Sequence, residues 1–163
     1  MNRAASAIDV RYSGLPQGSW RPSRSRVSSF LHAMVRAADA APVELSVLLV
    51  GDAAMRTLNR RHRHIDRTTD VLSFGLPRAA RFAHDLARPL GDLVVSLPTC
   101  RRQARAAGCP PLRRLAHLLA HGLLHLLGRD HRTPAAFARM ERLARRLVEA
   151  ALGAAARHSE TGA

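Results

Sequence analysis

Three histidines in an apolar, helix-forming run constrain the fold of this chain more than any other feature. His121, His125 and His131 lie in the run HGLLHLLGRDH, with the spacing H-x3-H-x5-H. Residues four apart lie on one face of a helix, so His121 and His125 point the same way. Gly128 tolerates the left-handed backbone that ends many helices, and a turn there would bring His131 back toward the other two. The spacing predicts a metal site with three imidazole ligands and an open position, the pattern of catalytic zinc.

The helix that carries these histidines is expected to be buried. Apart from histidine, residues 112–127 are Leu and Ala, with two Arg near the start and one Gly. A helix that is apolar nearly all round belongs in a core, where imidazoles without partners would be costly. A metal would satisfy them. We interpret His117, one turn earlier, as a hydrogen-bonded core residue; the alternative is that it orients a metal ligand.

The remaining segments predict one α+β domain: a small mixed sheet of about four strands packed with helices, and the histidine-bearing helix at its centre. Apolar patterns indicate strands at 7–12, 43–50, 68–74 and 91–97. Helical periodicity indicates helices at 25–40, from Asp52, at 98–107, at 110–128 and from Thr133. Residues 78–90 read as a loop or hairpin, and Phe137 is expected in the buried stripe of the last helix. The domain covers 1–163, with a core of about 5–152 and a disordered tail at 153–163.

Charge points to a polyanionic partner. All 26 basic residues are arginine, and the formal net charge is +14. Arginine binds phosphate in a bidentate fork, and so large a positive charge favours nucleic acid. The alternative is simply a well-solvated surface.

Other features narrow the class of protein. The chain has no uninterrupted apolar stretch long enough for a membrane span. Asp9, Arg11 and Pro16 stand where a secretory signal would need apolar residues. A soluble, cytoplasmic protein is therefore expected. Cys100 and Cys109 are too far apart for a C-x-x-C motif and are interpreted as packed thiols.

The spacing of the histidines also matches the metzincin protease pattern H-E-x-x-H-x-x-G-x-x-H, except at one position. Gly122 stands where those proteases have their general-base glutamate. Without that base a peptidase would lose its main proton acceptor. The pattern therefore favours a metal site but not ordinary proteolysis.

The run HGLLHLLGRDH resembles the signature of the YbeY family, bacterial single-domain endoribonucleases of ribosomal RNA maturation. Three further segments resemble family segments in the right order, and the match spans about residues 43–150. They are LNRRHR at 58–63, TDVLSF at 69–74 and GDLVVS at 91–96. Two positions depart from the family pattern: Arg129 replaces a frequent aromatic residue, and Gly75 replaces a common proline.

The resemblance implies one zinc ion bound by His121, His125 and His131, and an active site made of these residues and Arg63. Arg63 would face the metal cleft, where it could clamp the scissile phosphate; the alternative is a surface arginine at a helix end. Arg129 could add phosphate affinity or be a solvated turn residue. The implied activity is single-strand-specific cleavage of RNA, in 16S rRNA 3′-end maturation and ribosome quality control, with the small ribosomal subunit as partner.

Several alternatives stay open at the level of sequence. The attacking group is either water or the RNA 2′-OH, and Asp130 is either a base or, as we favour, a residue that orients an imidazole or caps the turn. Two other functions compete: a ribosome-assembly factor that binds RNA and has a structural metal, and a metal hydrolase of another substrate. Oligomeric state is not indicated.

Overall fold

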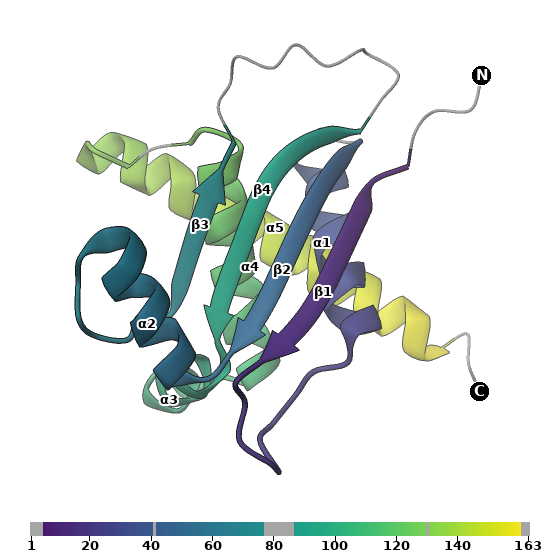
Figure 1. The fold of residues 1–163 in the computed structure, drawn as a ribbon. Coiled ribbons are helices and arrows are strands. Elements are labelled where there is room, and N and C mark those ends of the chain that lie inside the picture. Colours follow the sequence, from purple (N-terminus) through teal and green to yellow (C-terminus); the bar gives the residue numbers. More distant parts are fainter. Residues whose placement is uncertain (1–4, 41, 77–86, 130, 161–163) are drawn as a thin grey trace.

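The computed structural model describes residues 5–40, 42–76, 87–129 and 131–160. This part of the chain contains one four-stranded mixed sheet with the strand order β1-β2-β4-β3 (Figure 1). Strands β1, β2 and β4 are parallel to one another, and β3 pairs with β4 in the antiparallel direction. The strands are β1 (Ala7–Ser13), β2 (Val43–Val50), β3 (Val71–Gly75) and β4 (Arg88–Ser96).

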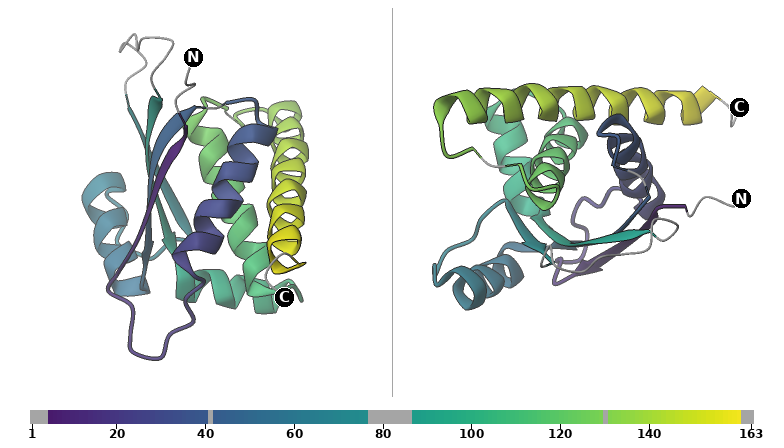
Figure 2. Two further views of the ribbon diagram at one scale, coloured as in Figure 1. Left: turned by 90° about the vertical axis from the view of Figure 1, so that its right-hand side faces the viewer. Right: turned by 90° about the horizontal axis from the view of Figure 1, so that it is seen from above.

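Helices cover the two faces of the sheet unequally. Helix α2 lies on one face, whereas α1 and α4 pack on the other and α5 crosses outside both of them (Figure 2). The helices are α1 (Arg24–Ala37), α2 (Asp52–Arg63), α3 (Leu97–Ala106), α4 (Pro111–Leu126) and α5 (Pro134–Glu160). The main core therefore lies between the sheet and α5, with α4 at its centre, and the predicted α+β architecture is confirmed.

Helix α4 is buried because it has apolar residues on most of its surface. Leu115, Leu119 and Leu123 are fully buried in the main core. On the side toward the sheet, Gly122 allows close approach: a Cβ atom there would lie 2.7 Å from Leu93 Cδ2 in β4. Glycine at this position thus sets how near the histidine helix lies to the strands.

Three details differ from the sequence-based expectations. Strand β4 begins at Arg88, so the last residues of the predicted loop at 78–90 are extended; residues 77–86 lie outside the described part. Helix α5 continues to Glu160, whereas we expected a disordered tail from residue 153. Phe137 is 50% exposed, so its predicted place in the buried stripe is wrong. No helix in the described ranges has the length and apolar character needed to cross a bilayer.

Candidate functional site

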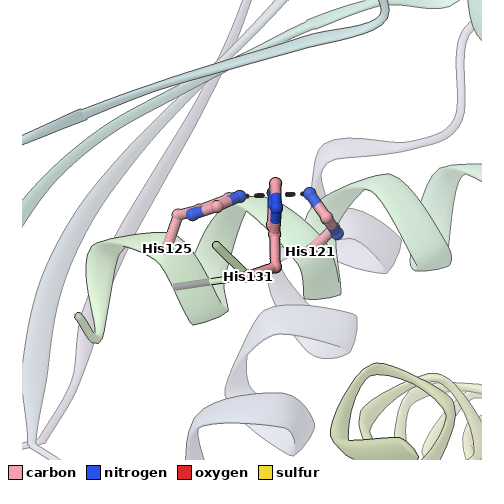
Figure 3. A group of neighbouring side chains, drawn as sticks. All are labelled: His121, His125 and His131. Carbon is pink, nitrogen blue, oxygen red and sulfur yellow. Dashed lines mark hydrogen bonds between the residues drawn. The ribbon is translucent and has the colours of Figure 1, made fainter. Parts of the chain in front are cut away.

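The imidazoles of His121, His125 and His131 converge at the C-terminal end of α4 (Figure 3). Nε2 of His121 lies 3.1 Å from Nε2 of His125. Each of the three residues offers one nitrogen, and these three atoms lie within 4.8 Å of one another. His131 is exposed, whereas the two helical histidines are half-buried. The structure therefore brings together the three histidines that the spacing predicted to converge.

A glycine turn positions the third histidine. Gly128 has φ +82°, the left-handed conformation that ends helices. Its N–H donates to the His125 carbonyl at 2.9 Å, and the N–H of Arg129 donates to the Leu124 carbonyl at 2.9 Å. These two bonds form a Schellman motif that closes α4 and reverses the chain. Because the reversal directly precedes His131, this imidazole returns to the face that carries His121 and His125.

Burial favours the neutral form of the His121 imidazole. It lowers the pKa of His121, and the neighbouring His125, His117 and His131 lower it further. A neutral imidazole has a free lone pair, which is the form that coordinates metals. His117 stacks on His121 with ring centroids 6.5 Å apart, and burial also lowers its pKa. His117 thus lies against His121 but is not one of the converging three.

The spacing of the nitrogens fits zinc. A tetrahedral zinc holds imidazole nitrogens at about 2.0–2.1 Å, which places any two of them about 3.3 Å apart. The 3.1 Å separation between His121 and His125 is already close to that value. His131, on the exposed loop after α4, offers a third nitrogen within 4.8 Å of the other two, and three protein ligands leave one position open.

Arg63, the last residue of α2, reaches the outer strand of the sheet. Its Nη2 donates to the carbonyl of Ser73 in β3 at 3.2 Å. A Cβ on Gly122 would touch Val71 of β3, and one on Gly75 would touch Leu126 at 3.7 Å. Ser73 lies between these two β3 positions, so it faces the α4 turn that contains His125. Arg63 thus lies against β3, a strand that packs on α4, whereas α2 itself lies on the other face of the sheet.

The carboxylate of Asp70, at the start of β3, serves the fold. Asp70 Oδ1 accepts from the N–H of Val71 at 2.8 Å, and its Oδ2 accepts from Gln103 Nε2 at 3.0 Å. Arg114 forms an ion pair with the same carboxylate at 3.6 Å. Asp70 therefore holds the start of β3 to α3 and α4. Asp130, the other carboxylate considered, lies outside the described residues.

One residue of the site was missed by sequence reasoning. The ring of Phe137, in the first turn of α5, meets the His131 ring edge-on with centroids 6.0 Å apart. Thr133 caps this helix, because its Oγ1 accepts from the N–H of Ala136 at 3.1 Å. The helical periodicity of α5 placed Phe137 with the core residues. The signal that could have located it correctly was its position at the helix start, six residues after His131.

The comparisons with known proteins agree with this geometry. The family model described as endoribonuclease YbeY matches residues 18–151. The chain belongs to the YbeY family. A YbeY relative from Anaeromyxobacter sp. (strain Fw109-5) is 47% identical over 149 residues, covering 86% of this chain and 73% of the relative. One from Halorhodospira halophila is 41% identical over 136 residues, covering 83% and 87%.

Other YbeY relatives match over a smaller share of their length. The match to the Rhodopseudomonas palustris protein is 44% identical over 112 residues and covers 68% of this chain and 65% of that protein. The match to the Myxococcus xanthus protein covers only 36% of its length. The solution structure of TM1509 from Thermotoga maritima aligns with a TM-score of 0.63 and 23% identity, covering 96% of both chains. At that identity the likeness supports the fold alone.

Proposed function

We propose that this protein is a zinc-dependent endoribonuclease that cleaves single-stranded RNA. The observation that carries the proposal is the convergence of three imidazoles on one point, with an open position, in a chain of the YbeY family. Bound zinc would polarise a phosphoryl oxygen and lower the pKa of a coordinated water. The other features of the site suit phosphate chemistry better than peptide chemistry.

Position 122 argues against a peptidase. The protease pattern needs a glutamate there, but in this fold a Cβ at that position would already lie 2.7 Å from Leu93 Cδ2 in β4, closer than van der Waals contact. No general base can therefore extend from it. Arg63 supports a phosphate substrate instead, because a guanidinium held on β3, the strand that packs on α4, can bind phosphate oxygens and offset the charge that develops on them.

We assign three residues to hold the metal and one to the phosphate. His121, His125 and His131 provide the nitrogen ligands, and Arg63 positions the scissile phosphate. The substrate we propose is the 3′ region of 16S rRNA in the small ribosomal subunit, in the cytoplasm. This choice rests on the family and on the net charge of +14, which favours a polyanion.

The test is cleavage of a single-stranded RNA by purified protein with a measured zinc content. We expect stoichiometric zinc and cutting in the wild type, and loss of both in His125→Ala. His32→Ala, which changes a half-buried histidine of α1, is the matched control and should keep both. Cutting that persists in metal-free His125→Ala would refute the proposal. Folded His125→Ala that still supports small-subunit assembly would favour the ribosome-assembly factor instead.

A further inference from the structure

A pocket lined by several arginines lies near the C-terminal end of α4, and the three converging histidines do not line it. It has a volume of about 330 Å³, and three arginines from distant parts of the chain line it. Arg88 comes from the start of β4, Arg129 from the turn after α4, and Arg146 from α5. Leucines of α4 and α5 form its apolar part: Leu124, Leu127, Leu143 and Leu147.

The three guanidinium groups of this pocket have no anionic partner in the described part of the chain. Several other arginines do: Arg102 pairs with Asp52 at 2.7 Å, and Arg113 with Glu149 at 2.8 Å. Asp39 is the single acidic residue among those lining the pocket, and it makes no ion pair with the three arginines. Three positive charges around one hollow repel each other, and a bound anion would relieve that repulsion.

The size and the mixed lining limit what the anion can be. A volume of about 330 Å³ is at the lower end for ligand pockets and suits one small group, not a folded partner. Arginines can bind a phosphate in a bidentate fork, and the leucines offer an apolar surface to a base or ribose. The carboxylate of Asp39 can accept hydrogen bonds from the amino group of a base. Together these groups match a single nucleotide.

The pocket and the histidine cluster share the last turns of α4. Leu124 lines the pocket and is followed directly by His125, whereas Arg129 lines it and lies two residues before His131. The two sites therefore lie on different sides of one helix end. A helix with its side chains is about 10–12 Å across, so a single strand could reach from one site to the other over the end of α4.

We propose that this pocket binds one nucleotide of the RNA strand, through its phosphate, beyond the point of cleavage. The inference rests on the proposed endoribonuclease function and adds to it a second contact for the substrate. Arg88, Arg129 and Arg146 bind the phosphate, and the leucines contact the nucleoside. The pocket thereby fixes the path of the strand away from the metal.

The experiment compares two triple variants that remove the same charge. One changes Arg88, Arg129 and Arg146 to Gln; the control changes Arg139, Arg142 and Arg145 of α5, which are exposed and do not line the pocket. Binding of a short fluorescein-labelled single-stranded RNA to the zinc-loaded full-length proteins is followed by anisotropy across a salt series, and gels confirm that the RNA is intact. We expect roughly tenfold or greater loss of affinity in the pocket variant, with a salt slope lower by about 0.7 per lost phosphate contact, and a smaller loss in the control.

Single charge reversals test the same point with less risk to folding. Arg146→Glu and Arg145→Glu change adjacent exposed residues of α5, and thermal unfolding should be alike in both. Only Arg146→Glu should reduce RNA affinity strongly. Equal losses in each matched pair, or no loss in either, would overturn the proposal. It would also be overturned if a poly-glutamate peptide competed for the pocket better than RNA, since that would indicate an acidic protein segment.

The outcome is separable from that of the proposed function. If wild-type protein cuts RNA while both triple variants bind it equally, the pocket assignment is wrong and the nuclease stands. If the matched variants differ in RNA binding while zinc-loaded wild type cuts no RNA, the nuclease assignment is wrong and the binding pocket stands.

Discussion

A Cβ atom on Gly122 would lie 2.7 Å from Cδ2 of Leu93, closer than real side-chain contacts allow. It would also lie 3.3 Å from Val71 Cγ2. Helix α4 thus approaches β3 and β4 so closely that position 122 has room only for glycine. In a metzincin this helix position carries the catalytic base, whereas here it packs against Leu93 of β4 and Val71 of β3. The three histidines remain, but the chemistry that they can support is different.

Adding a methyl group at this position should destabilise the protein. Overpacking a core costs about 1–3 kcal/mol, and the better helix propensity of alanine returns up to about 1 kcal/mol. We expect Gly122→Ala to lower the free energy of unfolding by up to about 2 kcal/mol in urea titrations, on that balance. Gly75→Ala is the control, because its Cβ would meet Leu126 at an ordinary 3.7 Å. Combining Gly122→Ala with Leu93→Ala should cost less than the sum of the two single changes; strict additivity would contradict the proposed clash.

Asp52 should give the protein a measurable acid dependence. Burial raises the pKa of its carboxyl, but hydrogen bonds from Arg102, Ser96 and Thr99 outweigh this and hold the pKa at about 2, below the ordinary 3.8. A lowered folded-state pKa means that the stabilisation is fully present above about pH 4 and is lost as pH falls through about 2.

We therefore expect Asp52→Asn to destabilise the protein at neutral pH and to flatten the acid limb of its stability curve. The loss should be about 1 kcal/mol at pH 7, after allowance for solvent screening of a partly exposed group. Denaturant titrations between pH 2 and pH 7 measure both effects. Asp66→Asn, which removes an exposed ion pair with Arg56, is the control and should change stability less. Parallel pH curves for wild type and Asp52→Asn would contradict the assignment.

Arg63 should affect turnover and not the metal. Because its guanidinium contacts β3 from α2 and is not among the three ligands, zinc content should be unchanged in Arg63→Ala. The rate of RNA cleavage should fall by roughly 10²–10³, the usual effect of losing one donor that stabilises developing charge. Arg63→Lys should recover only part of the rate, since an ammonium does not bind phosphate in a fork. A similar loss in Arg61→Ala, at a nearby exposed arginine, would indicate a general charge effect.

Phe137 should influence the third metal ligand more than the fold. Its ring is half exposed, so Phe137→Ala should change the unfolding free energy of the zinc-free protein little. The same ring contacts His131 edge-on, and residues that hold a ligand in place commonly affect metal affinity. We expect zinc titrations to show several-fold weaker binding in Phe137→Ala. Ile65→Ala, at another exposed apolar residue, should leave zinc affinity unchanged.

Local sequence predicted the elements and the convergence of the three histidines well, because the signals for both are short-range. The apolar run of β2 gave its bounds, and Thr133-Pro134 located the start of α5. The histidine spacing and Gly128 predicted the convergence, since helical periodicity and one left-handed turn are properties of neighbouring residues.

Contacts between distant segments were harder to predict from the sequence. Helical periodicity assigned Phe137 to the core, but its place at the first turn of α5 leaves it in contact with His131. The contact of Arg63 with Ser73, and the pocket formed by Arg88, Arg129 and Arg146, depend on the packing of several elements. No local pattern in one sequence encodes such packing.

The three imidazoles lie within eleven consecutive residues, from His121 to His131. Closing so short a loop costs little chain entropy, and two of its three ligands need only a helix. The position of Arg63 instead depends on the contact of α2 with β3 and on the pairing of β3 with β4. The strand pairing joins residues that are farther apart in the sequence. Such contacts cost more loop-closure entropy than the histidine turn does. In a refolding chain we therefore expect affinity for zinc to return no later than the contact of Arg63 with Ser73, so that a bound metal would hold the end of α4 while the distant segments assemble.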